Sequence, residues 1–356
     1  MYKKFLMGIA AMAALTLVSC SSDDLNSLSD NSSKNEAISF DGYLGRSAVA
    51  VNGSRGSVET KEQLKTDGFG VFGKYNADAG QNFGSDLFNN VKVYFSSTAE
   101  PAKWTYDNTK YWPTEGHIDF LAYAPHVDNK TLTGSSIDFT VDGDVTKQKD
   151  LLWANAKDQT KANNSGTNKV EFTFNHALAK IGYKVKLKEA YSNATISLNK
   201  ITLAGSKDET TKAFYKTGTI DLSKTSSDGL WTNQSFNDKQ NFDWFSNNTN
   251  TQKLGTADYP NPATDYLFVI PQDFSKSTVE GGTKADELYV IVDYTISYTN
   301  GATATMKSTV SSQIKKNFEQ GKAYTINLTI GLTPIEFNAT VNDWVDDNTI
   351  PEIPLN

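Results

Sequence analysis

Short runs of alternating apolar and polar residues recur along most of this 356-residue chain and constrain its fold more than any other feature. Residues 170–174 read Val-Glu-Phe-Thr-Phe, and residues 324–330 repeat the alternation. A period of two places the apolar side chains on one face of a β-strand. The helix-like stretches are all short, such as residues 57–65 and 311–320. Many short strands with Asn-, Gly- and Asp-rich joints predict an all-β chain built of β-sandwiches.

The clearest local signal is a hairpin in the last fifth of the chain. Two alternating runs, residues 288–298 and 302–310, flank Asn300-Gly301. Both central residues of a type I′ turn need a positive φ, which Asn and Gly tolerate. The pattern therefore predicts a two-stranded hairpin here.

The length allows two domains of ordinary size. The alternating pattern resumes after His176–Lys180, and we place the domain boundary there. The predicted parts are a signal peptide at 1–19, a flexible tether at 20–36, an N-terminal strand segment at 37–55, an N-terminal sandwich at 56–177, a C-terminal sandwich at 178–344 and a tail at 345–356.

The first twenty residues have the features of a signal peptide. Lys3 and Lys4 precede an apolar run that is too short to span a bilayer comfortably. Leu17-Val-Ser-Cys20 resembles the bacterial lipobox, in which the cysteine is acylated and the chain is cut before it. Cys20 is the only cysteine, so it is the predicted lipid attachment point and no internal disulfide can form.

Charge and motifs argue against several functions. Loss of residues 1–19 removes two lysines and takes the net charge from −7 to −9. An acidic chain without a basic cluster is a poor binder of nucleic acid. The three histidines, His117, His126 and His176, lack ligand partners at metal-binding spacing, and no nucleophile, phosphate or dinucleotide motif is present. We expect no enzyme, metal or cofactor, although paired acids of a glycosidase stay open because their separation is spatial.

Two other patterns have two readings each. Asp142-Gly-Asp144 could supply calcium ligands, but a turn explains it better. Trp104 and Trp112 lie among tyrosines and a proline, where they could form an aromatic shelf for sugars. Core filling is the interpretation we favour, because aromatic residues commonly fill sandwich cores.

The chain contains only two arginines, Arg46 and Arg55, and both lie in Gly-containing sequence near the N-terminus. Chance clustering is one explanation. The functional one is that an Arg-specific protease could cut only here, at exposed and extended sequence. Such a cut would remove the alternating strand that carries Ile38, Phe40 and Leu44.

Loss of a first strand would leave an apolar groove with unpaired backbone groups, which is a template for a strand from another molecule. A candidate donor is the tail, with Ile350, Ile353 and Leu355 as its apolar residues. Its prolines, Pro351 and Pro354, suit an edge strand. A frayed terminus is the alternative.

Several segments, taken in order, resemble the fimbrillins of Bacteroidota, the Mfa-like subunits of type V pili. They are Leu17–Cys20, Ile38–Phe40, Gly68–Phe72, Trp104–Tyr106, Lys110–Pro113, Ile118–Pro125, Asp150–Ala154, Phe172–Lys180, Val269–Gln272 and Phe337–Trp344. Ser21-Ser-Asp-Asp24 also resembles the surface-export signal of lipoproteins from this phylum.

The resemblance implies two tandem transthyretin-like β-sandwich domains and export as a lipoprotein to the outer membrane and the fimbrium. It implies cleavage after Arg55, with Arg46 as the reserve, and polymerisation with other pilin subunits by strand exchange in support of adhesion. The expected partners are the same or accessory pilins, the outer membrane through lipid on Cys20, and an Arg-specific protease. The alternatives are a surface glycan-binding lipoprotein and a pilus anchor subunit that keeps its lipid.

Overall fold

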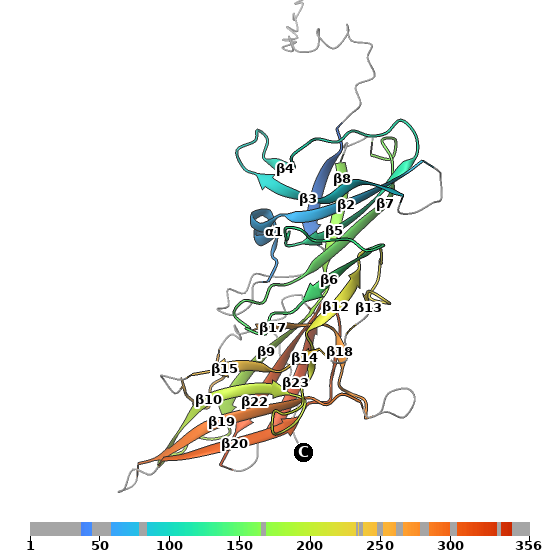
Figure 1. Ribbon diagram of the computed structural model, residues 1–356. Helices are drawn as coiled ribbons and strands as arrows, with labels where there is room; N and C mark the ends of the chain where they lie inside the picture. Colours follow the sequence, from blue (N-terminus) through green and yellow to red (C-terminus); the bar gives the residue numbers. More distant parts are fainter. Residues whose placement is uncertain are drawn as a thin grey trace, which may run out of the picture. The chain divides into compact units, whose positions relative to one another are not determined.

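The computed structural model describes residues 37–44, 58–77, 84–164, 169–232, 234, 238–247, 252–260, 266–277, 285–299, 305–332 and 336–343, the last range as backbone only (Figure 1). Within these ranges the chain forms 23 strands and one helix, α1 (Lys61–Asp67). The all-β prediction is therefore confirmed. None of the described helices is long and apolar enough to cross a membrane.

The first part of the chain builds a seven-stranded sheet whose order is β1-β8-β7-β5-β2-β3-β4. β1 and β4 are at opposite ends of this order, yet they pack against each other, so the sheet curls until its two ends meet. The strands are β1 (Ser39–Leu44), β2 (Phe69–Asn76), β3 (Ser85–Ser96), β4 (Lys103–Thr105), β5 (His117–Ala124), β7 (Leu152–Gln159) and β8 (Lys169–His176).

The later part of the chain forms a four-stranded and a five-stranded sheet. Tyr183 of the four-stranded sheet contacts Trp244 of the five-stranded sheet, with ring centroids 4.8 Å apart, so the two sheets face each other across apolar side chains. The four-stranded sheet contains β17 (Tyr266–Val269), β9 (Ala179–Leu187), β22 (Lys322–Ile330) and β23 (Glu336–Asp343). The five-stranded sheet contains β15 (Phe242–Ser246), β10 (Ala194–Ala204), β16 (Gln252–Lys253), β19 (Tyr289–Tyr298) and β20 (Thr305–Gln313).

Short strands complete the structure in three small sheets. β12 lies between β6 and β13, β11 pairs with β14, and β18 pairs with β21. These strands are β6 (Ser136–Thr140), β11 (Phe214–Tyr215), β12 (Thr217–Asp221), β13 (Trp231–Thr232), β14 (Lys239–Gln240), β18 (Gln272–Asp273) and β21 (Asn317–Phe318).

Buried apolar side chains form two clusters. The first core lies inside the curled sheet and includes Phe69, Phe88 and Phe172. The second core fills the space between the two later sheets and also takes Phe72 and Tyr123 from the seven-stranded sheet. Residues Glu36–Asn356 make one compact unit, so the domain boundary near residue 177 and the transthyretin-like layout stay predictions.

Two local expectations can be compared with the structure. The helix expected at 311–320 is wrong, because residues up to Gln313 continue β20 and pair with β19, and Asn317–Phe318 form β21. The predicted hairpin is confirmed in its two strands. The observed register places Ser297 opposite Thr305, whereas a two-residue turn at Asn300-Gly301 would place it opposite Ala304. The turn itself lies outside the described residues.

Candidate functional site: the first strand and its groove

The first strand lies at the edge of the seven-stranded sheet and pairs with a strand 130 residues away in sequence. Ser39 is opposite Lys169 and Leu44 is opposite Phe174, in parallel register (Figure 1, the blue strand at the N-terminal end). Among the described strands, β8 is the one that shares a hydrogen-bonded ladder with β1. Loss of β1 would therefore break one ladder and leave the rest of the sheet order intact.

The predicted inward face of β1 is confirmed. Ile38 and Phe40 are 1% and 2% exposed, Leu44 is half-buried, and Tyr43 between these positions is exposed. A period of two places residues 38, 40, 42 and 44 on one side of the strand. β1 is thus an edge strand by its backbone and a core element by its side chains.

Phe40 sits in an aromatic pocket. Its ring centroid lies between 5.3 and 5.8 Å from the rings of four residues, and the contacts with two of them are edge-on. These residues are Phe88, Tyr106, Phe120 and Phe172. Edge-on and offset aromatic contacts add to the free energy gained from burial, so this pocket stabilises β1 more than burial of Phe40 alone would.

The N-terminal end of β1 is fastened to the segment after β4. The Ile38 backbone N–H donates to Lys110 O at 2.8 Å, and the Tyr106 hydroxyl donates to Ile38 O at 2.8 Å. The same hydroxyl accepts a hydrogen bond from Lys110 N at 3.1 Å. One side chain therefore links the first strand to the loop that covers it.

A buried polar cluster anchors the residues that follow the two arginines. Glu59 is fully buried, and its backbone N–H donates to Asp150 Oδ2 at 3.3 Å. The same oxygen is hydrogen-bonded to His176 Nδ1 at 2.5 Å. Burial, with the nearby carboxylates of Asp67 and Asp150, raises the pKa of Glu59 to about 9, so this carboxyl group is protonated at neutral pH. The cluster ties the segment before α1 to the end of β8, without any contribution from β1.

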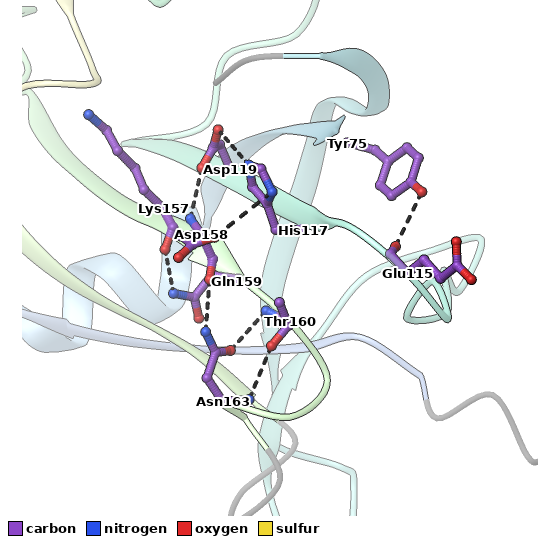
Figure 2. Close-up of polar contacts among 9 residues, drawn as sticks. All are labelled: Tyr75, Glu115, His117, Asp119, Lys157, Asp158, Gln159, Thr160 and Asn163. Atoms are coloured by element: carbon purple, nitrogen blue, oxygen red, sulfur yellow. Dashed lines mark hydrogen bonds and ion pairs between the residues drawn. The ribbon is translucent and has the colours of Figure 1, made fainter. Parts of the chain in front are cut away.

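A second histidine, His117, lies near two carboxylates at the ends of β5 and β7 (Figure 2). Its ring nitrogens are 3.8 Å from Asp119 Oδ2 and 3.9 Å from Asp158 Oδ1. Asp119 also accepts the backbone N–H of Asp158, which has a φ of 55°. These contacts lie within the β5–β7 pairing, where the register shifts between Ile118 and Phe120. Within the described residues, no group of three or more His, Cys, Asp or Glu side chains is arranged to hold a metal ion.

The structure shows what surrounds the two tryptophans and Asp142-Gly-Asp144. Trp104 and Trp112 are 9% and 2% exposed and pack against core phenylalanines, so the core interpretation is right and neither ring face can stack on a sugar. Asp142 and Asp144 accept the backbone N–H groups of Asp144 and Thr146, as in a turn.

The remaining site residues cannot be placed. Cys20, Arg46 and Arg55 lie outside the described residues, and so do the tail residues Ile350, Ile353 and Leu355. Sequence reasoning had missed Tyr106, Glu59 and Asp150. The motifs around Tyr106 and Asp150 contributed to the family resemblance, but they carry no sign of what these side chains contact.

The fimbrillin-like family model matches residues 57–344. The chain belongs to the fimbrillin-like family. The matched range begins two residues after Arg55 and leaves β1 outside it.

Two solved structures share the fold. A fimbrial protein from Bacteroides vulgatus is 22% identical, with a TM-score of 0.57 over 82% of this chain and 99% of that one. A putative cell adhesion protein from Parabacteroides distasonis is 10% identical, with a TM-score of 0.50 over 87% and 96% of the two chains. No curated protein matches the chain. At these identities the two structures support the all-β fold of the fimbrillin-like chain.

Proposed function

We propose that this fimbrillin-like chain is a structural subunit of a cell-surface fimbria that matures by loss of its first strand and polymerises by strand exchange. The observation that carries the proposal is the position of β1. It fills an aromatic groove with Ile38 and Phe40, yet it is an edge strand that one cut can separate from the body.

The distribution of arginine supports the cut. Arg46 and Arg55 are the only arginines, and both fall between β1 and the Glu59 cluster. A protease specific for arginine would therefore separate the first strand from a body that keeps its own anchoring contacts through Asp150 and His176. Arg55 is the preferred position, with Arg46 in reserve.

The vacated groove then becomes the acceptor. It offers unpaired backbone groups along β8 and the pocket of Phe40, and a strand from another subunit can use both. The candidate donor is the tail at 345–356 with Ile350, Ile353 and Leu355. Cys20 carries a lipid that delivers the subunit to the outer membrane, and cleavage releases the body from it. The function is assembly and adhesion, without catalysis.

Treatment of the purified full chain with an Arg-specific protease tests the proposal. Wild type is compared with Arg55→Lys, Arg46→Lys and the double variant, because lysine keeps the charge and blocks this cleavage. We expect one cut, one product that begins at Gly56 (or Ser47 when Arg55 is replaced), and SDS-resistant oligomers from the cut protein only. A chain that resists the protease and stays monomeric would contradict the role of a polymerising subunit. Retention of the lipid on Cys20 in cells would then indicate the anchor subunit.

A further inference from the structure

The groove that β1 occupies accepts large side chains at residues 38 and 40 but leaves little room for one at residue 42. A Cβ atom added to Gly42 would lie 3.1 Å from Phe69 Cε1 and 3.4 Å from Phe174 Cε2. Separations near 3.1 Å are tighter than ordinary carbon contacts, which lie at about 3.5–4.0 Å. A side chain here is accepted only if the two rings move.

Both rings are buried and packed against other aromatic rings. Phe69 is fully buried, with its ring centroid 5.2 Å from Phe174, 5.8 Å from Phe172 and 5.0 Å from Trp104. Phe174 is fully buried as well and also packs against Phe172. Cores packed to this density resist added volume, because a shift of one ring displaces its neighbours.

We propose that Phe69 and Phe174 form a steric gate at the Gly42 position, and that this gate selects the strand that enters the groove and sets its register. The partner that fits is an extended strand of another pilus subunit whose inward side chains run large, large and small at positions 38, 40 and 42. This inference rests on the proposed strand exchange and adds the specificity of the acceptor.

The gate reads one face of the strand only. Asp41 and Tyr43 point away from the groove; Asp41 pairs with Lys169 at 3.4 Å, and Tyr43 is 46% exposed. Side chains at these two positions are free to vary in size. Partner choice therefore depends on alternate residues, as in other cases of strand addition.

The gate also restricts how the candidate tail can bind. Ile353 and Leu355 fit the groove when they take the places of Ile38 and Phe40. If the tail were shifted by two residues, Ile353 would take the place of Phe40, and Leu355 would reach the Gly42 position and clash with Phe69 and Phe174. Of these two registers, the gate permits the first.

The gate can be tested first in the uncut full chain, independently of cleavage and exchange. We expect Gly42→Leu to lower the melting temperature by about 5 °C or more, Gly42→Ala to have a smaller effect, and Tyr43→Leu to stay within about 2 °C of wild type. Phe174→Ala should reduce the effect of Gly42→Leu, because the two substitutions act on the same space. Equal melting temperatures for Gly42→Leu and Tyr43→Leu would overturn the gate. If Gly42→Leu does not fold, the melting temperature of Gly42→Ala and the peptide experiment below test the gate instead.

The second test uses labelled peptides with the sequence of residues 37–44, offered to full chain that has been cut by an Arg-specific protease. The parent peptide and its Tyr43→Leu form should enter the groove, and the Gly42→Leu form should enter about tenfold less or worse. Equal entry of the two leucine peptides would overturn the gate. Failure of all three peptides would count against strand exchange itself, and the melting temperatures of the uncut variants would still judge the gate.

Discussion

Replacement of Phe40 by alanine is the perturbation that weighs most directly on the role of the first strand. Phe40 is 2% exposed, and four aromatic rings surround it at centroid distances of 5.3–5.8 Å. Truncation of a buried phenylalanine to alanine costs about 3–5 kcal/mol, since apolar burial is lost and a cavity remains. We therefore expect Phe40→Ala to lower the free energy of unfolding of the uncut chain by about that amount.

Guanidinium-induced unfolding followed by tryptophan fluorescence is a suitable assay, because Trp104 and Trp112 lie in the same core as Phe40. The control is Tyr43→Ala on the same strand, whose exposed side chain hydrogen-bonds to Asp41; we expect a loss below about 1 kcal/mol. If Phe40→Ala lost no more stability than Tyr43→Ala, β1 would not be a core element and the groove argument would fail.

Two further substitutions test single groups at the site. Tyr106→Phe removes the hydroxyl that bonds Ile38 O and Lys110 N, so we expect a loss of about 1–2 kcal/mol in the same unfolding assay. Tyr94→Phe, which removes an exposed bond to Asp107, is the control, and equal losses would contradict the role of Tyr106 as a fastening. Glu59 has a folded-state pKa of about 9 against 4.5 for the free side chain, so the folded state binds more protons between these values and stability falls as pH rises from about 4.5 to 9. Glu59→Gln should flatten the pH dependence of the free energy of unfolding by up to about 1.4 kcal/mol per pH unit, as measured by guanidinium unfolding at several pH values. Glu62→Gln, on the exposed side of α1, should not change it. Superimposable profiles of wild type and Glu59→Gln would refute the buried protonated acid.

The sequence was sufficient for local features whose cause is local. Alternation placed Ile38 and Phe40 on one face because a strand has a side-chain period of two, and the structure buries both. The core role of Trp104 and Trp112 followed from their size and apolar character. The motif resemblance identified the family, which the matched range 57–344 confirms.

Other features depend on contacts between distant segments, which no local pattern encodes. β1 pairs in parallel with β8. Nothing in residues 39–44 shows that their partner is β8 and not one of the several other alternating runs. The helix expected at 311–320 failed because pairing with β19 outweighed local helix propensity. His176 and the backbone N–H of Glu59 both reach Asp150 only because the fold brings the end of β8 against the segment before α1.

N-terminal sequencing of the protein taken from the cell surface shows most directly whether the mature subunit lacks its first strand. We expect a single N-terminus at Gly56, or at Ser47 if Arg46 is used, in SDS-resistant oligomers that contain neither Cys20 nor residues 37–44. Surface protein that begins at Cys20, retains Ile38 and Phe40 and is monomeric would contradict it.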